Sequence, residues 1–172
     1  GYWICVYAND QHKVELGTSL KDSPFYQALK VAEGGTMVFL DKECEALRRL
    51  WCIFEMHETL LNLKRRLQVW TPLGQVGSPL VSSGPVVEAL SSMDVRTAVA
   101  SNSCDQRRIK NHIAGVSETA GIKVEGSQMT VDNDCAAAAS YEEQLVKDHK
   151  PEFESINSGL QATVLGDGQD CS

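Results

Sequence analysis

Two kinds of hydrophobic pattern alternate along the first part of the chain. Short, mostly apolar runs, as in strands buried within a parallel sheet, occur at residues 2–8, 36–40 and 67–71. The segments between them, residues 24–33 and 42–66, carry apolar side chains at helical spacing, and Ser23 and Pro24 mark the start of the first. The order strand, helix, strand, helix, strand predicts a parallel α/β sheet.

Residues 42–66 have the strongest helical pattern, because they lack Gly and Pro and are rich in Leu, Glu and Arg. Asp41 precedes them as a candidate N-cap. Apolar side chains lie on two opposite faces of this predicted helix, which indicates burial between two layers or contact with another chain. One of these faces carries Ile53, Met56, Leu60 and Leu63. We therefore expect this face to bind other protein chains or to mediate self-association.

The segments that follow are shorter. Residues 86–90 fit a helix or a strand, residues 93–96 fit a strand, and residues 105–113 fit a helix capped by Ser103. Beyond Gly115 the pattern weakens, with a polar stretch that ends in four alanines. Helical spacing returns at residues 141–149 and 153–164.

The charge distribution changes at the same place. Residues 1–115 hold 13 Lys and Arg against 12 Asp and Glu, whereas residues 116–172 hold 3 against 11. We expect an α/β domain over residues 1–115, an acidic and partly helical extension over residues 116–172, and a disordered tail at residues 166–172. The net charge of −7 argues against free nucleic acid as a partner.

Composition excludes further classes of protein and site. No stretch approaches the roughly 20 consecutive apolar residues that a membrane-spanning helix needs, so we expect no membrane span. The six cysteines show no C-x-x-C spacing, and none adjoins a histidine in a zinc-ligand pattern. We therefore expect no metal, and buried free thiols in a reducing intracellular compartment. We also expect no cofactor, since the chain has neither a G-x-x-x-x-G-K-[ST] nor a G-x-G-x-x-G motif.

Two glutamates lie on or beside an apolar face of segment 42–66. Glu55 falls about 40° from Trp51 on a helical projection, at the edge of that face, and Glu58 falls near its middle. A carboxylate there is costly unless it is paired or functional. Burial would raise its pKa and suit it to acid/base or electrostatic chemistry. The alternative is a structural salt bridge, for example with Arg48, or exposure near a helix end.

Polar residues also follow the predicted strands. Asn9, Asp10 and Gln11 follow the first strand, and Asp41 follows the second. Ligands of parallel α/β sheets bind outside the carboxyl ends of the strands, so these side chains are candidates for substrate binding. The alternative is that they belong to solvated loops, which are polar in every soluble protein.

Several motifs, in this order, resemble the TIR (Toll/interleukin-1 receptor) superfamily, in particular the divergent TIR-like domains of multidomain proteins from microalgae. The motifs are YWICVYANDQH at residues 2–12, SPFYQAL at 23–29, FLD at 39–41 and RLWCIFE at 49–55. Trp51-Cys52-x-x-Glu55 matches the W-C-x-x-E motif of plant-type TIR domains. The resemblance covers most of residues 1–115.

The resemblance implies a flavodoxin-like fold, a three-layer sandwich around a parallel sheet. We expect that fold to be truncated at the N-terminus, because a TIR domain opens with a strand and a helix that would precede Tyr2. Many TIR domains cleave NAD between nicotinamide and ribose, and others act only as interaction modules. In the catalytic ones the essential glutamate is that of the W-C-x-x-E motif, here Glu55, and Trp51 would form the cleft wall.

Two functions follow from these observations. The first is a TIR-like interaction or structural subunit of a larger assembly, without catalysis, which the absent first strand and the double-faced segment 42–66 favour. The alternative is an NAD glycohydrolase with NAD as substrate and Glu55 as the catalytic carboxylate, which the W-C-x-x-E motif and the polar strand ends favour. Both functions rest partly on analogy at the level of fold.

Overall fold

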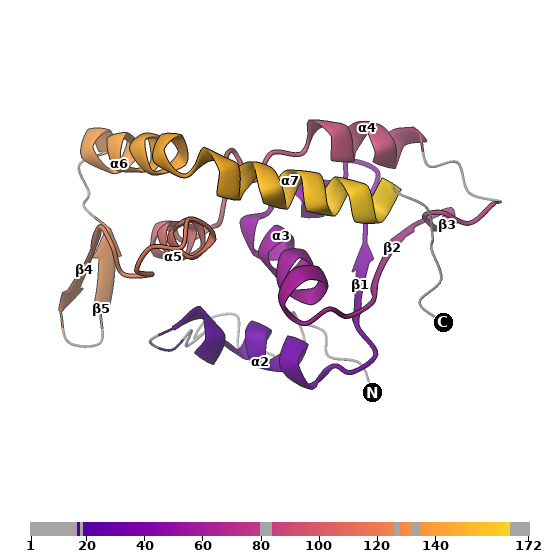
Figure 1. Cartoon of the computed structure of the whole chain (residues 1–172), viewed down its shortest axis with the longest axis horizontal. Coiled ribbons are helices and arrows are strands. Elements are labelled where there is room, and N and C mark those ends of the chain that lie inside the picture. The colour runs from indigo at the N-terminus through magenta and orange to yellow at the C-terminus, as the bar shows by residue number, and fades with distance from the viewer. Residues whose placement is uncertain (1–16, 18, 80–83, 126–127, 132–134, 166–172) are drawn as a thin grey trace.

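A parallel pair of strands, β1 (Thr36–Phe39) and β2 (Leu67–Thr71), lies beside helix α3 (Leu50–His57) in the computed structural model of the chain (Figure 1). The structure describes residues 17, 19–79, 84–125, 128–131 and 135–165. The strand predicted at residues 2–8 and the tail predicted at residues 166–172 lie outside the described residues. The other two predicted strands are confirmed, and with them a mixed α/β chain that contains a parallel pair.

One face of β1 carries exposed apolar side chains and is not covered by another helix or strand among the described residues. A short antiparallel strand, β3 (Gly74–Gln75), follows β2, so the described strands have the order β1-β2-β3. Successive side chains of a strand point to opposite faces. Val38 is half-buried against the core, whereas Met37 and Phe39 are exposed on the opposite face. Phe39 is aligned with Trp70 of β2, which is half-buried.

The predicted helix that begins at Ser23 and Pro24 is confirmed as α2 (Pro24–Val31), and a 3-10 helix, η1 (Leu20–Asp22), precedes it. The Ser23 hydroxyl accepts a hydrogen bond from the Tyr26 N–H, as an N-cap does, and Pro24 occupies the first turn, where its missing N–H costs nothing. Ser19 caps η1 in the same manner. Local sequence therefore accounts for this part of the fold.

Arg65, just before β2, closes the C-terminal end of α2. Its guanidinium donates hydrogen bonds to the carbonyl oxygens of Leu29, Lys30 and Ala32. The last carbonyls of a helix have no partner within the helix, and a positive charge at that end is favourable to the helix dipole. Arg65 thus attaches the end of α2 to the segment that leads into β2.

The single helix predicted over residues 42–66 is wrong, because the segment is divided. It contains a 3-10 helix, η2 (Glu45–Arg48), then α3, then a π-helical turn, η3 (Glu58–Asn62). The break lies at Arg49, whose backbone is extended and forms a parallel bridge with Val99. Backbone hydrogen bonds of 2.8 and 3.1 Å flank this bridge and replace those of a continuous helix.

The second half of the chain begins with helix α4 (Gly84–Ser92), so residues 86–90 are helical. The strand predicted at residues 93–96 is wrong, because the chain turns there. The carboxylate of Asp94 accepts hydrogen bonds from both the backbone N–H and the Nε of Arg96, at 3.0 and 2.8 Å. These short-range bonds stabilise a turn at the expense of an extended strand.

Helix α5 (Ser103–Ile113) confirms the prediction for residues 105–113, with one difference in its cap. The side chain of Asn102 accepts hydrogen bonds from the N–H groups of Cys104 and Asp105, so Asn102 and not Ser103 is the N-cap. Asn and Ser are nearly equal as caps, and the local pattern does not separate adjacent candidates.

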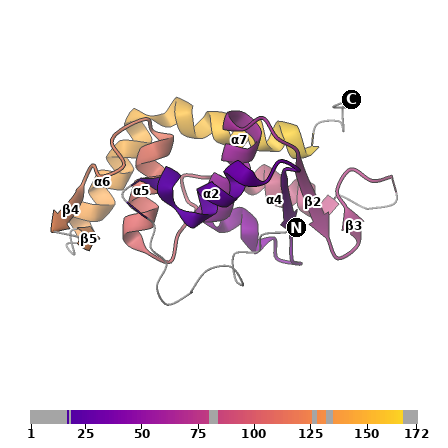
Figure 2. The same ribbon diagram turned by 90° about the horizontal axis from the view of Figure 1, so that it is seen from below.

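The C-terminal part consists of a hairpin and two helices. Strands β4 (Ile122–Glu125) and β5 (Gln128–Val131) form an antiparallel hairpin that the polar pattern did not predict. Helix α6 (Cys135–Asp148) begins before the predicted start at residue 141, and α7 (Lys150–Leu165) follows it. Figures 1 and 2 show α6 and α7 running one after the other along the molecule.

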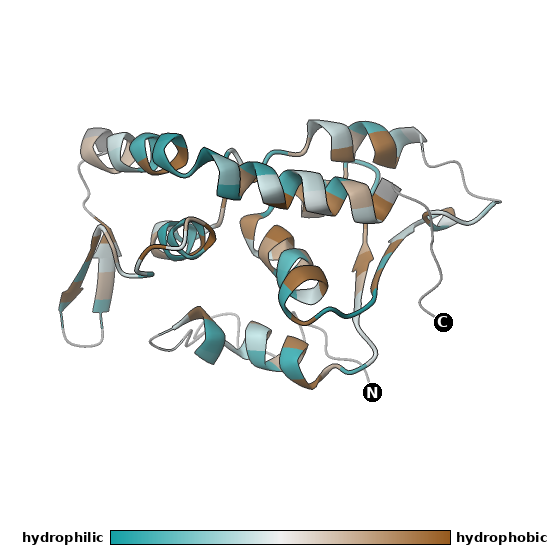
Figure 3. Cartoon of the chain, in the orientation of Figure 1, coloured by the Kyte–Doolittle hydropathy of each residue, from teal (hydrophilic) through white to brown (hydrophobic). Residues whose placement is uncertain are grey.

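Helix α7 contributes to the same core as the α/β part. Phe153 is fully buried, and it belongs to one apolar cluster with Ile53 and Phe54 of α3 and Leu90 of α4. Figure 3 shows apolar residues on α3 and the parallel strands, whereas α5 is largely hydrophilic. Residues beyond 115 thus complete the core, and a domain boundary at residue 115 stays a prediction.

Candidate functional site

Trp51 lies in the first turn of α3 and joins three helices. Its ring packs on Phe25 of α2 with ring centres 4.8 Å apart, and its edge-to-face contact with Phe54 has a centre distance of 5.8 Å. The indole Nε1 donates a 3.4 Å hydrogen bond to Asp105 Oδ2 of α5. Trp51 therefore lies among packed side chains of the chain itself, where it stabilises the junction of α2, α3 and α5.

Glu55 lies one helical turn after Trp51 and is half-buried. Burial raises the pKa of its carboxyl to about 7, although the charge of Arg49 acts in the opposite direction. A carboxyl with that pKa exchanges its proton near neutral pH, as a general acid or base must. The carboxyl of Glu55 is therefore suited to acid/base chemistry, whereas Trp51 is packed against other side chains of the chain.

Of the predicted strand-end residues, only Asp41 belongs to the described part of the chain. Asn9, Asp10 and Gln11 lie outside the described residues. Asp41 is exposed, and its Oδ1 accepts a 2.8 Å hydrogen bond from the N–H of Glu45. Asp41 therefore bonds the first N–H of η2, but Cys44 is the N-cap residue there, so the predicted N-cap at Asp41 is wrong.

The predicted interaction face of segment 42–66 is largely used inside the chain. Ile53 and Met56 are buried, with 0% and 1% of their surface exposed, and belong to the core. Leu60 and Leu63 are half-buried. Because α3 packs against both α5 and α7, its two apolar faces are explained by burial between layers. We therefore do not place a partner on Ile53 or Met56.

The second candidate glutamate, Glu58, is fully buried at the start of η3. Its Oε1 accepts a 2.7 Å hydrogen bond from Asn62 Nδ2 and lies 3.5 Å from His112 Nε2. Burial alone would raise the pKa of Glu58, but the hydrogen bonds from His112 and Asn62 hold it below its usual range. Glu58 thus has a structural partner, as the alternative supposed, but it is His112 and not the Arg48 given as an example, since Arg48 pairs with Glu45 at the surface.

His112 on α5 lies between two carboxylates. Nε2 faces Glu58, and Nδ1 lies 3.4 Å from Oε1 of Glu118, in the loop that follows α5. The hydrogen bond with Glu58 raises the pKa of His112, and the charge of Glu118 adds to this effect, while burial opposes it. Folding therefore favours the imidazolium form of His112 relative to a free imidazole. Sequence reasoning identified Glu58 but missed its partners, because no local pattern connects them.

A cavity of about 440 Å³ lies next to this pair. Its lining residues are His57, Asn62, His112, Ile113, Pro151, Glu152, Ser155 and Ile156. Nδ1 of His57 is buried and has no hydrogen-bond partner among the described residues, and burial lowers the pKa of His57. Both nitrogens of His112 already face carboxylates, so they are not available to a ligand.

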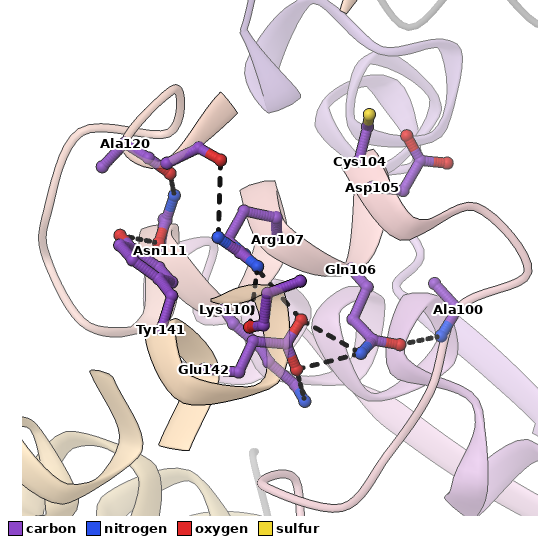
Figure 4. Close-up of polar contacts among 12 residues, drawn as sticks. Ala100, Cys104, Asp105, Gln106, Arg107, Lys110, Asn111, Ala120, Tyr141 and Glu142 are labelled. Atoms are coloured by element: carbon purple, nitrogen blue, oxygen red, sulfur yellow. Dashed lines mark hydrogen bonds and ion pairs between the residues drawn. The ribbon is translucent and has the colours of Figure 1, made fainter. Parts of the chain in front are cut away.

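A buried polar network joins α5 to α6 (Figure 4). Lys110 Nζ donates a 3.0 Å hydrogen bond to Glu142 Oε2, and Gln106 donates to both carboxylate oxygens of Glu142. The guanidinium of Arg107 lies over the ring of Tyr141, 4.1 Å from its centre. Arg107 and Lys110 of α5 thus share an acidic partner within the chain, Glu142, which indicates a structural role. The absence of an apolar stripe on α5 was the signal that its polar side chains need internal partners.

The described residues also show no metal centre and no membrane helix. No group of three or more His, Cys, Asp or Glu side chains is arranged there to hold a metal ion. No helix in that part of the chain is both long and apolar enough to cross a membrane. No protein-family model, curated protein or solved structure matches the chain.

Proposed function

We propose that this chain is a TIR-like interaction subunit without catalysis, and that it associates with a second copy of itself through the uncovered face of β1. That face carries Met37 and Phe39, which are 38% and 69% exposed. The exposure of Phe39 is the observation that carries the proposal. An apolar patch on a strand with an open side is a common site of protein association.

A flavodoxin-like, TIR-like fold is part of this proposal. Strand β1, helix α3 and the parallel strand β2 follow one another as the repeating unit of such folds does. The W-C-x-x-E motif, Trp51 to Glu55, lies on the helix of this unit. These two features support the proposed family.

A second copy suits this surface because two identical apolar faces are self-complementary around a two-fold axis. Among the described residues, β1 forms its strand pairing with β2 alone, and we propose that its other edge pairs with the same strand of the second copy. Trp70, next to Phe39 in the register, extends the apolar surface. Leu61 on η3 is the exposed large apolar residue of segment 42–66. It is less suited to self-association, because no other exposed large apolar residue of that segment accompanies it.

Replacing Phe39 with serine is expected to raise the dissociation constant of the self-associated form at least about tenfold, because it removes most of an aromatic side chain from the contact. Sedimentation velocity over a range of protein concentrations measures this dissociation constant. Val124→Ser is the matched control, since Val124 is 51% exposed on the hairpin at the other end of the molecule (Figure 1). A wild-type chain that stays monomeric, or an equal effect of both variants, would overturn the proposal.

The alternative, NAD cleavage, is favoured by the raised pKa of Glu55. We nevertheless expect the purified chain to release no more nicotinamide from NAD than its Glu55→Ala variant does, because Trp51, the expected cleft wall, packs inside the chain on Phe25 and Phe54. The measurement is nicotinamide release over time, with Glu88→Ala on α4 as a control for the loss of an exposed carboxylate. Release that is lost in Glu55→Ala and kept in Glu88→Ala would replace the proposal with an NAD glycohydrolase.

A further inference from the structure

Glu118 connects η1 to the charged cluster on α5. Its Oε2 accepts a 2.7 Å hydrogen bond from the N–H of Leu20, and its Oε1 accepts one of 3.2 Å from the hydroxyl of Ser19. The same Oε1 lies 3.4 Å from Nδ1 of His112, whose Nε2 faces the fully buried Glu58. One line of side chains thus connects η3, α5, the following loop and η1.

We propose that Glu58, His112 and Glu118 form a pH-sensitive latch, which holds η1 and the first turn of α2 against α5 while His112 is protonated and releases them when His112 loses its proton. This inference is independent of the proposed association through β1. It concerns a local opening of the N-terminal helices and not a change of the whole fold.

The charged groups around His112 explain why the loss of one proton from its ring would open the latch. From α5, Arg108 places Nη2 3.6 Å from Glu118 Oε2 and so balances one carboxylate in part. From α7, Glu152 lines the adjoining cavity and adds negative charge. His57 on α3 lines the same cavity, and its lowered pKa favours the neutral ring. Without the charge on His112, the buried carboxylate of Glu58 has no cationic partner among these groups.

The direction of the pH effect follows from linkage. The pKa of His112 is raised above its reference value of 6.5 in the closed form, so the stabilisation is complete below 6.5 and is lost as the pH rises through the raised pKa. The pKa of Glu58 is lowered, so its stabilisation is lost only as the pH falls through that lowered value. Protonation of His57 opposes the closed form below its reference value of 6.5. The latch is therefore closed in mildly acidic solution and opens on the alkaline side.

The extent of opening is limited by the other attachments of this segment. Arg65 holds the C-terminal end of α2 through three backbone carbonyls, so the motion is a hinge about that end. The side chain of Leu20, fully buried when the latch is closed, would become exposed. Phe25 would move away from Trp51, which would uncover the N-terminal turn of α3.

The test is hydrogen exchange of individual amides by NMR as a function of pH, with each rate divided by its unfolded-chain rate. Above the His112 pKa, the protection of the Leu20 amide is expected to fall by up to about tenfold per pH unit. The amide of Leu40, which donates to the Trp70 carbonyl at 2.8 Å, is the internal reference and is expected to keep its protection. Equal pH profiles for the two amides would overturn the latch.

Two variants assign the effect to His112. His112→Gln is expected to lower Leu20 protection at mildly acidic pH and to remove its pH dependence, whereas His149→Gln, at the junction of α6 and α7, is expected to change neither. Glu118→Gln keeps an acceptor for the Leu20 N–H and removes one charge, so it is expected to flatten the profile without abolishing protection. The Glu118→Gln variant also tests the latch if the His112→Gln variant does not fold. A profile that stays steep in Glu118→Gln would overturn the proposal.

Discussion

Replacing Gly35 with alanine is expected to destabilise the chain by about 3 kcal/mol or more, because the new methyl group would meet backbone atoms that cannot rotate away. Gly35 has a φ of +95°, and a Cβ built there would lie 2.1 Å from the carbonyl oxygen of Arg66. The same oxygen accepts a 2.9 Å hydrogen bond from the N–H of Thr36 at the start of β1. The parallel strands would therefore have to separate at the end where they begin.

Gly34 provides a matched control one residue away. A Cβ at Gly34 would meet no atom within 4 Å, and the residue is exposed. Gly34→Ala is therefore expected to change the free energy of unfolding by less than about 1 kcal/mol, with a gain expected from the reduced freedom of the unfolded chain. Urea denaturation followed by circular dichroism measures both variants. Similar values for Gly35→Ala and Gly34→Ala would contradict the close approach of β1 and β2 at this point.

Replacing Phe153 with alanine is expected to lower the free energy of unfolding by about 3–5 kcal/mol, the range for removing a buried aromatic side chain. Phe153 is fully buried on α7 and packs in the core formed with α3 and α4. Leu73→Ala is the control, because Leu73 is 75% exposed and its truncation is expected to cost less than about 0.5 kcal/mol.

The position of the tryptophans makes this experiment informative about domain organisation. The chain has three tryptophans, at positions 3, 51 and 70, and all precede residue 115. Their fluorescence therefore reports on the N-terminal part, although Phe153 lies in the C-terminal part. Because α7 shares its core with α3, we expect the tryptophan transition in Phe153→Ala to shift together with the loss of helical circular dichroism. A tryptophan transition that does not move would show that the two parts unfold independently.

Much of the first half of the fold was predictable because its signals are local. The Ser23 hydroxyl cap and Pro24 mark the beginning of α2, and two short apolar runs mark β1 and β2. The break at Arg49 was not predictable, because it depends on a bridge to Val99, fifty residues further along the chain. Helical propensity within segment 42–66 gives no sign of that bridge, so tertiary pairing overrides it.

The candidate site shows the same division between local and distant causes. A carboxylate on an apolar helical face marked Glu58 as a residue that needs a partner, and the fully buried side chain has one in His112. The identity of that partner depends on how α5 packs against α3, which the hydrophobic pattern does not specify. The hairpin of β4 and β5 was missed for another reason, since each strand alternates apolar and polar residues over only four positions within a stretch that is polar on average.

The polar network of α5 gives an acidic residue of the C-terminal third a structural role. Arg107 and Lys110 are almost fully buried, and Glu142 on α6 is the carboxylate that faces both, at 3.8 and 3.0 Å. The C-terminal third thus acts as an intramolecular counterion for α5. A shortened chain that ended before α6 would keep these cations without their counter-charge, and an exchange of C-terminal segments between related chains would have to preserve an acid at position 142. Substitutions at positions 107, 110 and 142 should therefore be correlated during evolution.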